Sequence, residues 1–230
     1  EDMDALCFSY TPIDELRVHN ANMLGAGLLA RVGALTHEEK LIDAAHRATR
    51  YLLRYQHDDG GWWYAEAEYQ HWIDSFHTGF NLVALQHVLR DGGMVEAAEA
   101  LERGHLYFLR HFYEPDGAPR YFHDRRDPID VHCPAQGFVT MTRLWDVTEA
   151  PELLERSARW FLDHMRAPEG YFYYRLRRHG PNRIPYLRWG QAWAYFGLAH
   201  LEEFLSGADS YRKGEAEPAP RAPDGPGDTR

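Results

Sequence analysis

Hydrophobic residues recur along this chain at helical spacing, in two kinds of segment. In the first kind an apolar face lies opposite a charged one. Leu41, Ala45 and Leu52 follow the i, i+4, i+11 spacing of one helix face, while Lys40 and Arg47 fall on the other. We therefore expect outer helices with one side in water over residues 38–55, 94–112 and 152–165.

The second kind of segment is apolar nearly all round and rich in glycine and alanine. A helix with that pattern is usually buried. Small side chains let two helices approach closely, although each glycine costs about 1 kcal/mol of helix propensity. We expect inner helices over residues 18–32, 76–89, 134–145 and 190–204.

A turn motif links each outer helix to the next inner helix. An acidic residue and a glycine are followed by a tyrosine five positions after the acid. The motif occurs at residues 59–64, 116–121 and 169–174, with glycine-to-glycine spacings of 57 and 53. A period in this range is typical of stacked or circular helical units.

Together these patterns predict an all-α fold, a partial (α/α) toroid of about four helical hairpins. Tyr10 precedes Tyr64 by 54 residues, close to one period. We therefore expect the chain to begin inside a repeat and to be truncated from an (α/α)6 barrel whose N-terminal hairpins are missing. The toroid domain is expected over residues 1–205. Proline, glycine, alanine and charged residues dominate residues 206–230, which predicts a disordered C-terminal tail.

The charge and hydropathy of the chain exclude some classes of binding partner. The net charge is −10 over 230 residues. This disfavours nucleic acid, whose binding proteins carry basic surfaces, and also an anionic membrane surface. No apolar run reaches about 18 residues, so no membrane insertion is expected. The two cysteines, Cys7 and Cys133, suggest no disulfide framework and predict a cytoplasmic protein.

Aromatic residues make up 14% of the chain. They fit either a large aromatic core or a cleft whose flat rings stack on sugars or isoprenoids.

Candidate chemistry lies in the links that lead into the inner helices. Three of the four links contain Ile-Asp, at Asp14, Asp74 and Asp130, and a histidine follows each aspartate at +5, +3 or +2. An aspartate just before a helix can cap it, so these residues have a structural explanation as well as a catalytic one. The recurrence of the Ile-Asp pattern favours the structural role. If the polar groups converge on one funnel, they supply general acids and bases. The candidate catalytic residues are Asp74, His77, Asp130, His132 and Tyr64.

The same links offer groups that could hold a sugar. Arg188 and Gln191 could bind a uronic acid carboxylate, and aromatic rings could stack on the sugar. The candidate binding residues are His19, Asn22, Trp72, Tyr121, Arg188, Trp189 and Gln191. No cofactor is expected, because there is no phosphate loop and no nucleophile motif. The His and Asp residues of positions 123–132 match no tight metal motif, so no metal is expected either.

Residues 56–62 are similar to the Q-x-x-D-G-x-W motif of toroidal terpenoid cyclases and prenyltransferase subunits. In those proteins the motif is mostly structural. The D-x-D-D cluster of the cyclases and the zinc ligands of the prenyltransferases have no match in this chain. The resemblance therefore supports a toroid and leaves isoprenoid chemistry as the least favoured reading.

Residues 4–205 resemble polysaccharide-biosynthesis proteins of the VpsJ type. The similarity is carried by residues 7–12, 19–22, 72–80, 116–119, 128–132 and 184–193. It implies a six-hairpin toroid and a role in capsule or exopolysaccharide formation. We therefore expect a carbohydrate-active protein that acts on a polysaccharide or sugar-lipid. The candidate activities are those of a uronyl epimerase, a lyase and a glycoside hydrolase. The alternative is a non-catalytic glycan-binding module.

Overall fold

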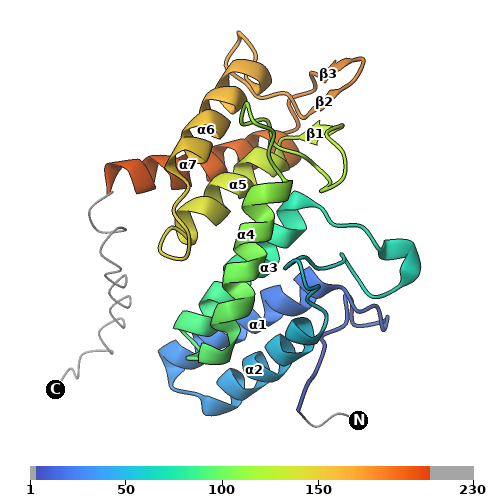
Figure 1. Cartoon of the computed structure of the whole chain (residues 1–230), viewed down its shortest axis with the longest axis vertical. Coiled ribbons are helices and arrows are strands. Elements are labelled where there is room, and N and C mark those ends of the chain that lie inside the picture. Colours follow the sequence, from blue (N-terminus) through green and yellow to red (C-terminus); the bar gives the residue numbers. More distant parts are fainter. Residues whose placement is uncertain (1–3, 208–230) are drawn as a thin grey trace, which may run out of the picture.

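The computed structural model describes residues 4–207, and the structure consists mainly of seven α-helices (Figure 1). Most of the predicted tail lies outside the described residues. The inner helices are α1 (His19–Thr36), α3 (Ser75–Arg90), α5 (His132–Arg143) and α7 (Ala192–Ser206). The outer helices are α2 (Glu39–Arg54), α4 (Ala98–His111) and α6 (Pro151–Met165). The predicted alternation of inner and outer helices is confirmed.

Two predicted helices start differently from the sequence pattern. A 3-10 turn, η2 (Val95–Ala97), precedes α4, and a π-helical turn, η3 (Leu187–Gln191), precedes α7. Another 3-10 turn, η1 (Glu68–Gln70), lies in the link before α3. None of the helices in residues 4–207 is both long and apolar enough to cross a bilayer.

The outer helices bury one face, as their amphipathic pattern requires. In α6, Leu154, Trp160, Phe161 and Met165 are buried, while charged residues occupy the exposed side. Burial of a large apolar side chain stabilises the fold by roughly 1.5–3 kcal/mol. These faces therefore hold the outer helices onto the inner ones.

The inner helices pack side by side in chain order, α1 on α3, α3 on α5 and α5 on α7. Their small residues allow this close approach. A Cβ atom at Gly79 would lie 2.7 Å from the Gln136 side chain, and one at Gly197 would lie 2.6 Å from the Ala135 Cα. The cost of glycine in a helix is thus offset by close helix packing.

The three acidic-glycine turns have the same geometry. Gly60, Gly117 and Gly170 adopt φ of 98°, 90° and 95°, a region that favours glycine. Each glycine N–H donates to the carbonyl three residues earlier, at 2.9 Å in every copy. The repeat seen in the sequence is therefore a repeat of backbone conformation.

The third turn differs from the others in its surroundings. A Cβ atom at Gly60 or Gly117 would collide with the backbone of the next outer helix, at Arg103 and Arg156 respectively. At Gly170 it would meet no atom of the described residues within 4 Å. An open groove of about 610 Å³ runs instead between Gly170 and the exposed side of α7.

A small antiparallel sheet, which the helical patterns did not predict, joins two links. Its strands are β1 (Ile129–Asp130), β2 (Arg175–Arg177) and β3 (Gly180–Asn182), in that order. Asp130 is opposite Arg175, and Arg175 is opposite Asn182. Strands of two or three residues are too short for an alternating pattern to show. The sheet places the β2–β3 hairpin directly beside the start of α5 (Figure 1).

Candidate functional site

Asp74 and His77 form a hydrogen-bonded pair at the start of α3. The Asp74 Oδ1 accepts the His77 main-chain N–H at 3.0 Å, which caps the helix. Its Oδ2 lies 2.7 Å from the His77 Nδ1 and accepts the Trp72 indole N–H at 3.1 Å. Asp74 is buried, whereas a quarter of the His77 side chain is exposed. This aspartate therefore both caps the helix and orients an imidazole.

Asp130 and His132 form a second pair, at the start of α5. The Asp130 Oδ1 accepts the His132 main-chain N–H at 3.1 Å and lies 2.7 Å from the His132 Nδ1. Its Oδ2 accepts the Arg175 guanidinium through Nε at 2.9 Å and Nη2 at 2.7 Å. Burial alone would raise the pKa of Asp130, but the bonds from His132 and Arg175 hold it below its usual value.

Asp14, the third aspartate of the Ile-Asp pattern, forms no such pair. It accepts hydrogen bonds from the Thr11 hydroxyl and the Leu16 N–H. Helix α1 starts at His19 without a side-chain cap. Of the three aspartates, Asp74 alone occupies an N-cap position, so the repeated Ile-Asp pattern does not correspond to repeated helix capping.

Aromatic rings connect the two pairs. The Phe76 ring centroid lies 4.3 Å from that of His77 and 5.6 Å from that of His132. Phe80 packs against His77 at 5.9 Å, and Trp193 against His132 at 4.9 Å. Phe80 and Trp193 also contact each other. The structure thus brings four of the five predicted catalytic residues to one aromatic wall.

Tyr64, the fifth candidate, is beside the first pair. Its ring stacks on Trp72 at 4.6 Å and lies 4.7 Å from His77. Burial, together with Tyr10 and the Asp74 charge, raises the pKa of Tyr64 to about 12. Tyr64 is therefore neutral near pH 7 and can donate a hydrogen bond but cannot act as a ready base.

Tyr121 and Trp189 also line the aromatic wall. The Tyr121 ring meets Phe76 edge-on at 5.3 Å, and burial followed by the Asp74 charge raises its pKa. Trp189 meets His132 edge-on at 5.5 Å from η3 and is 51% exposed. The exposed Arg188 stacks on Trp189, with its Cζ 5.2 Å from the ring centroid. A flat ring and a cation thus lie at the edge of the site.

Two predicted binding residues use their amides on the main chain. Gln191 brackets Phe172, accepting its N–H at 2.8 Å and donating to its carbonyl at 2.7 Å. Asn22, fully buried, accepts the Phe8 N–H at 3.0 Å and donates to the Ala48 carbonyl at 2.8 Å. Both amides hold segments together rather than facing the Asp–His pairs.

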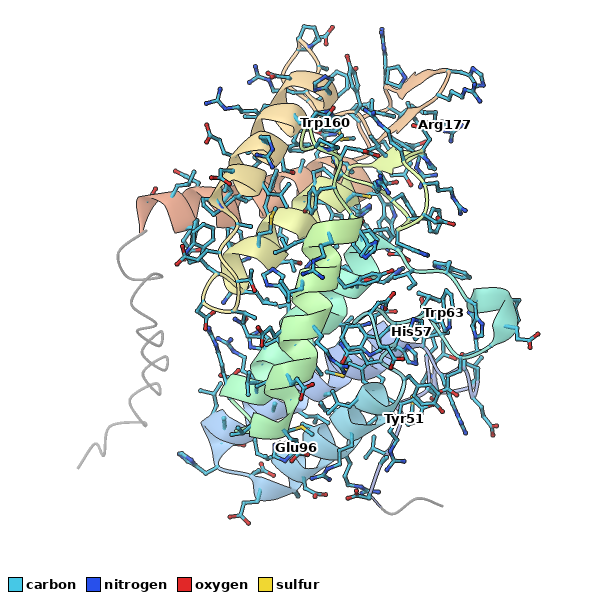
Figure 2. All side chains as sticks on the ribbon, viewed as in Figure 1. Tyr51, His57, Trp63, Glu96, Trp160 and Arg177 are labelled. Carbon is cyan, nitrogen blue, oxygen red and sulfur yellow. The ribbon has the colours of Figure 1, made fainter. Side chains whose placement is uncertain are left out.

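His19, the first residue of α1, is buried and contacts the main chain of Trp63. Its Nδ1 lies 2.8 Å from the Trp63 carbonyl oxygen, and burial lowers its pKa to about 4. His19 is therefore neutral near pH 7. The Trp63 ring stacks on His71 and meets His57 edge-on; Figure 2 shows Trp63 and His57 next to each other.

Both imidazoles of the pairs are held in one orientation. An ionised carboxylate can only accept hydrogen bonds, so the histidine Nδ1 that faces it carries the proton. The other ring nitrogen, Nε2, is then left as an acceptor. The His132 Nε2 is buried and has no hydrogen-bond partner within residues 4–207. A polar cavity of about 10 Å³, lined in part by Asn20, Asn81 and His77, has room for about one water molecule.

Arg175, Phe76, Phe80 and Trp193 belong to this site but were not among the predicted residues. The sequence offered one indication of Arg175, which directly follows the tyrosine of the third turn motif. No three metal-binding side chains gather at any point of the described chain.

No family model matches the sequence, and the curated proteins contain no significant match. Solved structures do match. The cellobiose 2-epimerase from Bacillus thermoamylovorans aligns with a TM-score of 0.74 at 11% identity, over 87% of this chain and 58% of the epimerase. A sugar epimerase from a ruminal bacterium gives 0.69 at 14% identity, over 88% and 60%. An unsaturated glucuronyl hydrolase specific for heparin gives 0.64 at 18% identity, over 94% and 63%.

These similarities, at identities below one fifth, establish the fold. The chain has the architecture of a partial (α/α) toroid, as its repeat predicted. It spans 58–63% of the length of the three proteins named above and 46% of a D-mannose isomerase that also matches.

Proposed function

We propose that this chain is part of a carbohydrate-active enzyme in which His77 and His132 transfer protons to and from a sugar. The observation that carries the proposal is the pair of aspartate-oriented imidazoles on either side of Phe76. Each aspartate fixes the ring and favours the imidazolium that forms on proton uptake. Two such groups supply one base and one acid.

The arrangement favours epimerisation or elimination over hydrolysis. In an epimerisation, one Nε2 removes the proton from a sugar carbon next to a carbonyl group. The other histidine, starting as imidazolium, returns a proton to the opposite face, so that protons balance. Glycoside hydrolysis requires two carboxyl groups that reach the scissile bond. The oxygens of Asp74 and Asp130 are instead engaged by histidine, tryptophan and arginine.

Two further observations support a carbohydrate substrate. Structural neighbours of the toroid include sugar epimerases and a glucuronyl hydrolase. From the sequence resemblance to VpsJ-type proteins we also propose a role in surface polysaccharide biosynthesis, on a polysaccharide or sugar-lipid. The free thiols of Cys7 and Cys133 fit a cytoplasmic location. In this proposal the toroid domain covers residues 1–205, and most of residues 206–230 lie outside the described residues.

One observation favours a second function, a non-catalytic glycan-binding module. The His132 Nε2 is covered, and Trp189 and Trp193 lie against its ring. A site that only binds sugar would use the exposed Trp189 ring and would not need an open nitrogen. For His132 to act as a catalyst, Trp189 must move so that a sugar can reach the His132 Nε2.

Solvent exchange separates the two functions. Incubating the protein in D₂O with reducing and uronate oligosaccharides should place deuterium on the sugar carbon that loses its proton, as detected by NMR. His77→Asn and His132→Asn should each slow this incorporation about 100-fold, the usual size of a general acid–base contribution.

The matched control is His87→Asn. His87 forms a similar contact, with its Nδ1 3.0 Å from the Asp91 Oδ2, but at the other end of α3. This variant should exchange at the normal rate. Sugar binding without any exchange would favour the binding module, and an equal loss in the His87 variant would contradict the assigned roles.

A further inference from the structure

The segment from Tyr171 to Gln191 is basic in an acidic protein. It contains five arginines and neither aspartate nor glutamate, whereas the whole chain carries a net charge of −10. The segment comprises β2, β3 and η3. The segment therefore carries a net positive charge in a chain whose net charge is negative.

This basic segment is attached directly to the candidate site. Its β2 strand pairs with β1, and the Val131 N–H donates to the Tyr174 carbonyl at 3.1 Å. Arg175 binds Asp130, and its guanidinium Cζ lies 5.7 Å from the Tyr121 ring centroid. At the other end of the segment Trp189 contacts His132. The segment therefore contacts the second Asp–His pair at two points.

Four of the five arginines are available to a ligand. Arg177, Arg178, Arg183 and Arg188 are exposed, and they form no ion pair with any carboxylate of the described residues. Because strand side chains alternate, Arg177 shares the face of Arg175, while Leu176 packs toward the core. Figure 2 shows Arg177 on the projecting hairpin.

Aromatic rings accompany these charges. The Arg183 Cζ lies 5.9 Å from the Tyr173 ring centroid, and the Arg188 Cζ lies 5.2 Å from that of Trp189. Tyr186 and Trp189 are exposed as well. Guanidinium groups match the planar, bidentate geometry of carboxylates, and flat rings offer an apolar face to sugar rings.

We propose that the ligand of this site is an acidic glycan, whose carboxylates are bound by the arginines of the Tyr171–Gln191 segment. The proposal rests on the carbohydrate activity proposed above and adds the charge of its substrate. Arg177 and Arg188 contact the acidic groups, and Trp189 supports a sugar ring beside His132. A nucleic acid fits less well, because the molecule outside this segment is strongly acidic and would repel a long polyanion.

Titration calorimetry with matched oligosaccharides tests the proposal. The ligands are an oligogalacturonate, its neutral methyl ester, a neutral glucan of the same length, and a single-stranded oligonucleotide. We expect the oligogalacturonate to bind about tenfold or more tighter than its methyl ester. This preference should shrink as salt is raised, because exposed charges are screened.

Variants locate the contact. The double variant Arg177→Gln, Arg188→Gln should weaken oligogalacturonate binding about tenfold and reduce its preference over the methyl ester. A cooperative thermal unfolding transition shows that the variant is folded. The control removes two charges elsewhere, Arg156→Gln with Arg159→Gln, both exposed on α6, and should bind like the parent protein.

The outcomes separate this inference from the function on which it rests. Equal binding of acidic and neutral oligosaccharides would overturn the acidic-glycan inference and leave the carbohydrate function standing. Binding of no oligosaccharide would overturn both. Tighter binding of the oligonucleotide than of the oligogalacturonate would also overturn the inference, as would equal losses in the two double variants.

Discussion

The two Asp–His pairs have similar geometry but different support. In each pair an aspartate oxygen lies 2.7 Å from a histidine Nδ1. Asp74 receives its other side-chain bond from Trp72, a neutral indole two residues away. Asp130 receives its other bond from Arg175, a cation 45 residues away on another strand.

The difference shows that one pair is local and the other depends on tertiary structure. The hydrogen bonds that Asp74 makes to Trp72 and His77 all lie within residues 72–77. The orientation of His132 depends on the β1–β2 pairing and on a buried carboxylate whose pKa is lowered by its bonds from His132 and Arg175. We therefore expect the second pair to be the more sensitive to change.

The largest expected effect comes from Arg175→Leu. Removing one partner of a fully buried ion pair costs about 3–5 kcal/mol. Because a quarter of the Arg175 side chain is exposed, we expect a loss of about 2–3 kcal/mol in the free energy of unfolding, measured by urea denaturation.

The control for this change is Arg159→Leu, which breaks the exposed Arg159–Glu155 pair on α6. Such pairs contribute about 0.5 kcal/mol or less. Equal losses in the two variants would show that Arg175 acts as an ordinary surface arginine.

The second prediction concerns Asp74→Asn. Asparagine caps helices about as well as aspartate, but its NH₂ group cannot accept the Trp72 indole N–H, so stability should fall by about 1–2 kcal/mol. Catalysis should nevertheless fall roughly 100-fold, because a neutral amide neither fixes the Nδ1 proton nor favours the imidazolium. The checks are urea denaturation and the deuterium exchange assay. A large loss of stability with normal exchange would make Asp74 a cap alone.

The third prediction uses pH. The pKa of Asp130 is lowered on folding, so the unfolded chain binds its proton more readily. Its stabilising contribution is therefore complete above 3.8, its ordinary value, and is lost as the pH falls through the folded value. The destabilisation caused by Asp130→Asn should be smaller at pH 3 than at pH 5, as measured by urea unfolding. A penalty independent of pH would contradict the ionic role.

The smallest effect is expected for Trp72→Phe. This change removes the indole N–H that Asp74 accepts at 3.1 Å and keeps an aromatic ring against Tyr64. A single hydrogen bond of this kind contributes about 0.5–1.5 kcal/mol, more when its acceptor is charged. Thermal unfolding should show a smaller loss than for Arg175→Leu. A loss as large as that of Arg175→Leu would show that the two Asp–His pairs are equally sensitive to the loss of a supporting side chain.

Much of the fold could be predicted because its signals are local. Helix periodicity, the small residues near Gly79 and Gly197, and the turn glycines all act over a few positions. The Asp–His pairs were also within reach, because spacings of +3 and +2 leave the side chains close together.

The remaining features depend on contacts between distant segments. Arg175 reaches Asp130 through strands too short to leave an alternating pattern. Gln191 and Asn22 were predicted to bind substrate, yet both amides bond the main chain. An amide that holds a loop and one that holds a ligand have the same sequence signature.

The turn at Gly170 has a consequence for the order of folding. It keeps the backbone geometry of the turns at Gly60 and Gly117, although no outer helix of the described chain lies across it. The turn conformation therefore does not depend on a helix packed against the glycine, and in the first two hairpins that helix can pack after the turn has formed. Local contacts of this kind close quickly. We thus expect each hairpin to form its acidic-glycine turn first and its helix–helix packing afterwards. The array can then assemble one unit at a time along the chain.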